Sequence, residues 1–208
     1  MKRTFFYYVF MALAVMTLAS ACDKDDFDTD YPSDEIEYDG SRKILVAYFS
    51  ATGNTQRRAE EIVAATGADI YRIEASEPYA SNPYDDSDRI QNESYNNLRP
   101  GVGNLPESID EYDVIFVGSP IWWHNPAMVV CTFLENYDLE GKIVIPFFTY
   151  GSTEYQVKNG ITIFTYGSTE YLQQSIDKIH EVTPTSVHLR TYTGGGVESW
   201  LRDIHIIQ

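Results

Sequence analysis

The strongest constraint on the fold is an apolar segment that leads directly into a hydroxyl-rich turn and then into an amphipathic helix. Residues 43–49, Lys-Ile-Leu-Val-Ala-Tyr-Phe, have the nearly continuous hydrophobicity of a strand buried on both faces of a parallel sheet. Residues 56–66 bring their apolar side chains onto one face of a predicted helix. The turn between them, residues 50–55, has the sequence Ser-Ala-Thr-Gly-Asn-Thr. The sequence therefore predicts a strand, a tight turn and a helix that begins directly after it.

Residues 50–55 combine groups that suit a bound phosphate. The hydroxyls of Ser50, Thr52 and Thr55 would lie beside N–H groups and the positive end of the helix dipole. Gly53 permits a tight turn and close approach of the backbone to a ligand. The same spacing is also typical of a turn in which a Ser or Thr side chain caps the helix, and the loop alone does not separate the two interpretations.

The kind of phosphate loop is narrowed by what the sequence lacks. The chain has no GxxxxGK[ST] sequence, and the first turn has no GxGxxG sequence, so neither a Walker loop nor a dinucleotide fingerprint is present there. A neutral, hydroxyl-rich loop suits a single terminal phosphate. Arg57 and Arg58 follow the loop and are interpreted as exposed helix charges.

Four further apolar segments are predicted to be strands, and they alternate with helical segments. The strands are expected at residues 68–75, 113–118, 143–148 and 186–192. The helices are expected at about 85–98, from Pro126 onward, around 172–179, and after Gly194-Gly195-Gly196. This alternation predicts an α/β fold with a parallel sheet. Ligands of such folds bind beyond the carboxyl ends of the strands, here residues 50–55, residues 119–125 and the region after Phe148.

The second of these strand ends carries two adjacent tryptophans. Residues 119–125, Ser-Pro-Ile-Trp-Trp-His-Asn, are predicted to form a loop. In one interpretation Trp122 or Trp123 stacks on a flat ring system; in the alternative, one fills the core and the other shields the loop. His124 could donate a hydrogen bond or a proton to such a ring, but a solvent-exposed loop histidine is the favoured interpretation. The sequence contains no HExxH or CxxC, so no metal site is predicted.

The third strand end contains an internal repeat. Residues 148–155, Phe-Thr-Tyr-Gly-Ser-Thr-Glu-Tyr, recur without change as residues 164–171. A period this short, with two copies, indicates a local tandem duplication of one strand-end loop rather than a solenoid. Only one copy can occupy the strand-end position, and the sequence leaves open which copy does so.

The first residues are predicted to lie outside the folded domain. Lys2-Arg3, an apolar stretch and the small residues Ala19-Ser20-Ala21 are together typical of a signal peptide over residues 1–21. Cys22 follows as in the lipobox of bacterial lipoproteins, so we expect it to be lipidated and to anchor the protein to a membrane; simple cleavage beside an incidental cysteine is the alternative. Residues 22–41 are predicted to be an acidic flexible tether, and residues 42–208 to be the domain.

Charge and cysteine content limit the partners. The formal net charge is −16, which argues against binding to a nucleic-acid backbone and is otherwise explained by solubility. The chain has two cysteines, Cys22 and Cys131. Acylation of Cys22 would leave Cys131 alone, and its apolar surroundings predict a buried small hydrophobic residue.

Taken together, these residues resemble the flavodoxin-like FMN-binding family. Residues 50–55 are similar to its [ST]-x-T-G-N-T phosphate loop, and the chain looks like the single-domain bacterial branch with a PIWW loop, residues 120–123. The remaining segments that fit this pattern in order are 73–79, Glu93 with Arg99-Pro100, 113–123 and 145–149. The resemblance implies a three-layer fold with a five-stranded parallel sheet and helices on both faces.

The resemblance also implies a cofactor site. The FMN phosphate would be held by the loop Ser50, Ala51, Thr52, Gly53, Asn54 and Thr55. The isoalloxazine ring would be bordered by Ser119, Pro120, Ile121, Trp122 and Trp123, and on a third side by Thr149, Tyr150, Gly151 and Ser152 or by their second copy, residues 165–168. The chain departs from the pattern at His124-Asn125, where Gly-Thr is common.

The expected function is an FMN-binding electron-transfer protein anchored at the cell envelope, either periplasmic or surface-exposed. Its partner would be a redox protein or a small quinone-like acceptor. One alternative is an FMN-dependent NAD(P)H:quinone or nitro reductase. A second is a flavodoxin-fold binding module that has lost FMN. The negative charge disfavours anionic reduced flavin, so a low reduction potential is expected.

Overall fold

The computed structural model describes residues 40–150, 156–158, 161–163 and 169–208. Several predicted features lie outside the described residues. They are the signal peptide, most of the tether with Cys22, and, in the repeated loop, Gly151, Ser152 and residues 165–168. None of the helices in the described part of the chain is long and apolar enough to cross a membrane.

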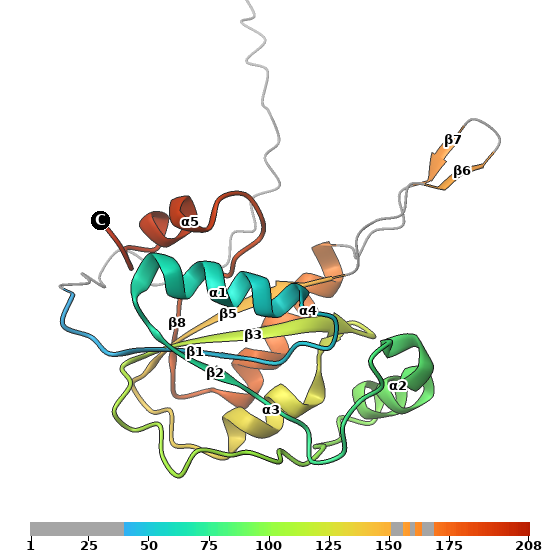
Figure 1. Ribbon diagram of the computed structural model, residues 1–208, viewed down its shortest axis with the longest axis horizontal. Coiled ribbons are helices and arrows are strands. Elements are labelled where there is room, and N and C mark those ends of the chain that lie inside the picture. The colour runs from blue at the N-terminus through green and yellow to red at the C-terminus, as the bar shows by residue number, and fades with distance from the viewer. Residues whose placement is uncertain (1–39, 151–155, 159–160, 164–168) are drawn as a thin grey trace, which may run out of the picture. The chain divides into compact units, whose positions relative to one another are not determined.

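A parallel sheet forms the centre of the fold (Figure 1). Its strands follow the order β2-β1-β3-β5-β8, and all neighbours on this path run parallel. A short sixth strand, β4, pairs antiparallel with β3, and β6 and β7 form a separate two-stranded hairpin. The strand bounds are β1 Ile44–Tyr48, β2 Asp69–Arg72, β3 Val114–Trp122, β4 Asn125–Pro126, β5 Ile143–Thr149, β6 Gln156–Lys158, β7 Ile161–Ile163 and β8 Val187–His188.

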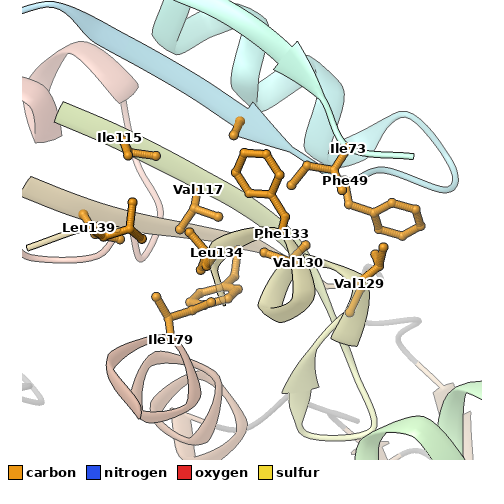
Figure 2. Close-up of a cluster of buried hydrophobic side chains, with 14 of the residues drawn as sticks. Phe49, Ile73, Ile115, Val117, Val129, Val130, Phe133, Leu134, Leu139 and Ile179 are labelled. Carbon is orange, nitrogen blue, oxygen red and sulfur yellow. The ribbon is translucent and has the colours of Figure 1, made fainter. Parts of the chain in front are cut away.

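Helices cover both faces of the sheet because its strands present apolar side chains in both directions. On one face, buried residues of α1 and α5 pack on alternate strand residues such as Val46 and Phe116. On the other face, α3 and α4 pack on residues such as Ile115 and Val117, and Figure 2 shows Phe133 of α3 among these side chains. The helices are α1 Asn54–Thr66, the 3₁₀ helix η1 Pro83–Asp86, α2 Ser87–Tyr95, α3 Met128–Glu135, α4 Thr169–Val182 and α5 Val197–Asp203.

Most predicted elements are found near their expected positions. Gly67 ends α1 in a left-handed conformation, and its N–H donates to the Val63 carbonyl, as expected of a glycine C-cap. The helix expected at 85–98 is divided into η1 and α2. The fifth strand is short, because regular pairing covers only β8 and Tyr192 adds one isolated bridge to Phe147. Cys131 is fully buried, as predicted, and burial raises the pKa of its thiol to about 12.

The prediction of a loop at residues 119–125 is wrong. Strand β3 continues to Trp122, and Asn125 and Pro126 turn back as β4 to pair with it. The turn residues Trp123 and His124 have φ of 48° and 70°, which is the left-handed geometry of a two-residue hairpin turn. Pro126 therefore lies in a strand instead of opening α3, which begins at Met128.

Candidate functional site

The turn between β1 and α1 is held by its own backbone and hydroxyl groups. The Gly53 N–H donates to Ser50 Oγ at 3.0 Å, and Ser50 is buried. Gly53 has a φ of 86°, a left-handed conformation that favours glycine. A Cβ added at Gly53 would meet no atom within 4 Å, so the turn is open on this side. Thr52 and Asn54 are exposed in the same turn, with Asn54 Nδ2 3.4 Å from Thr52 Oγ1.

The N-terminus of α1 has N–H groups that precede the first hydrogen bond of the helix. That bond joins the Arg57 N–H to the Gly53 carbonyl at 3.0 Å, so the amides of Asn54, Thr55 and Gln56 have no carbonyl acceptor in the helix. Among the described residues no side chain caps this end, and its first turn contains no acidic residue. The interpretation in which a Ser or Thr side chain caps the helix is therefore wrong, because the Ser50 hydroxyl accepts only the Gly53 N–H of the turn. The N–H groups and the helix dipole together favour an anion here.

Two arginine side chains reach this turn from different elements. Arg57, on α1, donates from Nη2 to Asn54 Oδ1 at 2.8 Å. Arg72, at the end of β2, donates from Nη2 to the Ser50 carbonyl oxygen at 3.2 Å. Arg57 is exposed, as predicted, and it is also hydrogen-bonded to the turn. The sequence did not predict that Arg72 lies beside this turn. The sequence carried no local signal for Arg72, because its contact with the turn depends on the pairing of β1 with β2.

A hydrogen bond connects the turn to the end of β5. The hydroxyls of Thr55 and Thr149 lie 2.8 Å apart, and Thr55 is almost completely buried. Thr149 is the last residue of β5 and pairs in register with Pro120 of β3. The first copy of the repeated loop therefore begins at a regular strand end, next to the turn that follows β1. The structure thus brings the ends of β1, β3 and β5 together, as the topology predicts.

The two tryptophans have different surroundings. Trp122 packs edge-on against Phe49 and Tyr79, with ring centroids 5.3 and 5.1 Å away. Trp123 is 38% exposed and makes an edge contact of 5.8 Å with Tyr95 of α2. This arrangement agrees with the alternative in which one tryptophan packs on the core and the other shields the connection that follows the strand. Trp123 nonetheless keeps exposed surface.

His124 does not lie in a solvent-exposed loop, so the favoured sequence interpretation is wrong. Its ring stacks on Tyr171 of α4, with centroids 3.7 Å apart and an interplanar angle of 9°. The Ser175 hydroxyl of the same helix donates to the His124 carbonyl at 3.4 Å. These contacts fix the β3–β4 turn to α4 although position 124 has a φ that favours glycine.

Ser119 points into the fold instead of toward the strand end. It is completely buried, accepts the Ala127 N–H on Oγ at 2.9 Å, and donates to the Pro120 carbonyl at 2.9 Å. The hydroxyl therefore fixes the start of α3 to β3. Pro120 and Ile121 are partly exposed on the outer part of the same strand.

A polar cluster that the sequence did not reveal packs against Trp122 through Tyr79. Glu93 is 7% exposed and accepts hydrogen bonds from Tyr79 Oη at 2.7 Å and from Arg89 Nε at 2.8 Å. Arg89 also lies over the Tyr79 ring, 4.1 Å from its centroid. Burial and the hydrogen bond to Glu93 raise the pKa of Tyr79. The spacing of Arg89 and Glu93 on one helical face was the only sequence signal for this cluster.

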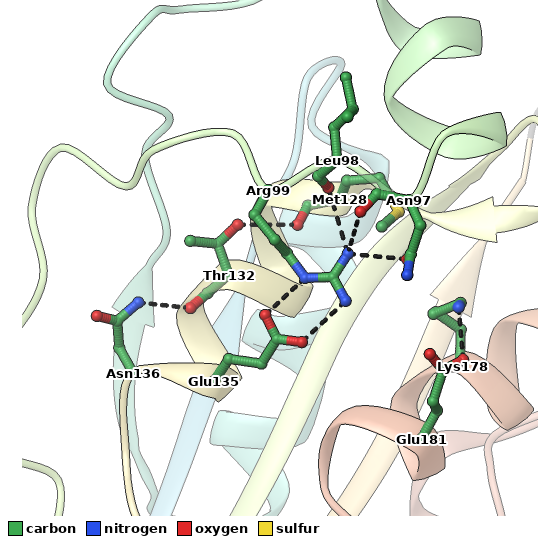
Figure 3. A network of polar contacts seen from close by, with 9 residues as sticks. All are labelled: Asn97, Leu98, Arg99, Met128, Thr132, Glu135, Asn136, Lys178 and Glu181. Atoms are coloured by element: carbon green, nitrogen blue, oxygen red, sulfur yellow. Dashed lines mark hydrogen bonds and ion pairs between the residues drawn. The ribbon is translucent and has the colours of Figure 1, made fainter.

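The segment that includes α2 also holds the β3–β4 turn directly. The Ser94 hydroxyl donates to the Trp123 carbonyl at 2.7 Å and accepts from Asn125 Nδ2 at 2.8 Å. Beyond the helix, Arg99 binds Glu135 of α3 through two hydrogen bonds of 2.5 and 2.8 Å, and Figure 3 shows its guanidinium directed at this carboxylate. The described residues contain no group of His, Cys, Asp and Glu that could hold a metal ion.

Comparison with known families agrees with this architecture. Residues 43–184 match the flavodoxin family. The chain belongs to the flavodoxin family. A search of curated proteins gave no match.

Solved structures include other flavodoxin-like proteins. A candidate flavoprotein from Bacteroides eggerthii is 34% identical, with a TM-score of 0.62, and the match covers 78% of this chain and 98% of that chain. One from Bacteroides uniformis is 28% identical, with a TM-score of 0.62 and coverage of 77% and 98%. A flavoprotein from Lactobacillus acidophilus in complex with FMN is 22% identical, with a TM-score of 0.56 and coverage of 73% and 92%, which shows the shared fold.

Proposed function

We propose that this flavodoxin-family chain binds FMN at the carboxyl ends of β1, β3 and β5. The observation that carries the proposal is the N-terminus of α1, where the amides of Asn54, Thr55 and Gln56 precede the first helical hydrogen bond and no described side chain caps them. A phosphate monoester satisfies such groups. The open side of Gly53 allows the phosphate to approach the backbone.

The ring end of the proposed site is formed by the β3–β4 turn and the end of β5. Trp123 and Tyr150 are 38% and 47% exposed, so both have aromatic surface available for a flat ring. Pro120 and Ile121 would border the ring from β3, and Ser119 would act only by fixing the backbone, because its hydroxyl is used inside the fold. Gly151 and Ser152 belong to the proposed site but lie outside the described residues.

Bound FMN would supply the electron-transfer chemistry, and the residues of the chain would bind and orient it. Glu93, Arg89 and Tyr79 hold Trp122 in place, and Ser94 holds the Trp123 carbonyl. The formal net charge of −16 disfavours an anionic reduced ring, so we expect a reduction potential below that of free FMN.

The proposal extends to an electron carrier at the cell envelope that belongs to the single-domain branch with a PIWW loop. The signal-peptide pattern of residues 1–21 and the position of Cys22 support export and lipid anchoring. The partner would be a redox protein or a small quinone-like acceptor. Metabolic labelling with a fatty acid, compared between the wild type and Cys22→Ser, tests the anchor: labelling that persists in the variant would contradict it.

A flavin titration of the purified protein tests the cofactor. We expect FMN fluorescence to change saturably with a stoichiometry of one FMN per chain. Protein that is colourless as purified and gains no flavin absorbance on addition of FMN would contradict the proposal and favour a fold that has lost its cofactor.

Steady-state kinetics separates a carrier from a reductase. A carrier needs no substrate pocket beside the ring, so we expect FMN-loaded protein to show no sustained NAD(P)H oxidation with a quinone or a nitroaromatic compound. Sustained NAD(P)H oxidation would contradict the proposal of an electron carrier and favour a reductase. Spectroelectrochemistry tests the potential, and a bound potential above that of free FMN would contradict the electrostatic reasoning.

A further inference from the structure

Seven arginines in the described part of this acidic protein divide into two groups by their contacts. The sequence has 31 Asp and Glu residues against 15 Lys and Arg residues, so carboxylates are abundant. Arg57 and Arg72 take part in none of the ion pairs found among the described residues. The arginines that do form such pairs are Arg58 with Glu61, Arg89 with Glu93, Arg99 with Glu135, Arg190 with Asp203 and Arg202 with Glu198.

Arg57 and Arg72 bind neutral oxygens of the turn at residues 50–55. Arg57 reaches Asn54 Oδ1 from α1, and Arg72 reaches the Ser50 carbonyl from β2. The two cations are therefore fixed beside the same turn from two different elements. A guanidinium has several N–H donors in a planar fork, so each side chain keeps donors for an oxyanion after making these contacts.

The position of Arg57 is unfavourable for the helix alone. It is the fourth residue of α1, which begins at Asn54, so its charge lies near the positive end of the helix dipole. The first turn contains no acidic residue that would compensate this charge. A bound anion would remove the conflict, because it would be attracted by the guanidiniums and by the helix terminus together.

We propose that Arg57 and Arg72 are specificity-determining residues of the FMN site, which pair with the phosphate dianion and make the chain prefer FMN over riboflavin. This inference rests on the proposed function. The loop itself is neutral, as expected from the sequence, but the proposal adds two positive charges beside it, from α1 and from β2. Arg58, although adjacent in sequence, is excluded because it pairs with Glu61 and lies over the Tyr192 ring.

The test measures dissociation constants for FMN and for riboflavin, which lacks the phosphate. The variants are Arg57→Gln, Arg72→Gln and the double variant, with Arg202→Gln as a control that removes an exposed charge from α5. We expect each single variant to weaken FMN binding by up to about fivefold, as for exposed charge pairs, and the double variant to weaken it more. Riboflavin binding should not change. Lysine variants at the same positions should keep part of the preference for FMN.

Salt dependence supplies a second readout. Raising the ionic strength from about 0.05 to 0.5 M should weaken FMN binding to the wild type more than to the double variant, because the charges screened by salt have been removed from the variant. Thermal unfolding of the ligand-free variants checks folding. Arg57→Gln should not lower the unfolding temperature, since it removes a charge that opposes the helix dipole.

The outcomes separate this inference from the proposed function. An unchanged ratio of FMN to riboflavin affinity in the double variant, or an equal loss for both flavins, overturns the role of the arginines and leaves FMN binding intact. Wild-type protein that binds neither flavin overturns the proposed function and the arginine proposal together. A selective loss of FMN affinity that Arg202→Gln does not reproduce supports the proposal.

Discussion

Replacing Ser119 by alanine separates a structural role of this residue from contact with a ligand. The Ser119 hydroxyl is completely buried, accepts the Ala127 N–H at 2.9 Å and donates to the Pro120 carbonyl at 2.9 Å. The substitution removes both hydrogen bonds, and the Ala127 N–H keeps its second acceptor, the Pro120 carbonyl at 3.2 Å. Because the amide keeps an acceptor, the cost is that of a typical hydrogen bond, and we expect a loss of about 1 kcal/mol in the free energy of unfolding.

Thermal and urea unfolding measure this loss. For a domain of this size, 1 kcal/mol corresponds to about 2–4 °C, so the unfolding temperature of Ser119→Ala should fall by about 2–4 °C. The dissociation constant for FMN should change little. Ser199→Ala on α5 is the matched control, because Ser199 is exposed and its loss should cost less than about 0.5 kcal/mol. An unchanged unfolding temperature together with a large loss of FMN affinity would show that the hydroxyl faces the ligand, and would refute this reasoning.

Three further predictions concern other parts of the fold. Gly53→Ala should lower the free energy of unfolding, measured in urea, by about 1 kcal/mol, because φ at Gly53 is 86°. Gly196→Ala is the control, because φ at Gly196 is −78°. Equal losses in the two variants would contradict this reasoning. Burial, with the nearby His180 ring, lowers the pKa of His188 to about 4, so the neutral form is favoured in the folded state. The stability that the neutral imidazole of His188 contributes is complete above about pH 6.5 and declines as the pH falls toward 4. The free energy of unfolding should therefore be about 1–2 kcal/mol lower at pH 5 than at pH 7, and His188→Gln should lack this difference. The same pH dependence in the wild type and the variant would contradict the assignment. Cys131 is buried and its pKa is raised to about 12, so its thiol should react with a disulfide reagent only in denaturant, and fast reaction in the native protein would count against this packing.

The positions of most strands and helices were predictable from the apolar segments of the sequence. Residues 43–49 and 143–148 are continuous apolar runs between turn signals, and both became central strands. The β3–β4 hairpin was not predictable, because its turn uses Trp123 and His124 at left-handed φ, where the usual sequence signal is glycine or asparagine. Stacking of His124 on Tyr171 accompanies this conformation, and that contact joins residues far apart in the sequence.

The candidate site shows the same limit. The turn at residues 50–55 was found from a local pattern, since strand, glycine and helix follow each other directly. Glu93 of α2 is buried with Arg89 and with Tyr79, and Tyr79 comes from a different segment. The few apolar residues of α2 therefore did not indicate that this helix is packed. The contact of Arg72 with Ser50 depends on the pairing of β1 with β2, and no local pattern records it. The contact of Thr149 with Thr55 likewise became visible only once the strands were paired.

The central claim is that FMN binds with its phosphate at the N-terminus of α1. Backbone amide chemical shifts of the purified protein, followed during titration with FMN, test it most directly. The proposal predicts the largest phosphate-dependent changes at residues 51–56, which are absent when riboflavin replaces FMN. Unchanged shifts at residues 51–56 in saturating FMN, or equal changes with riboflavin, would contradict it.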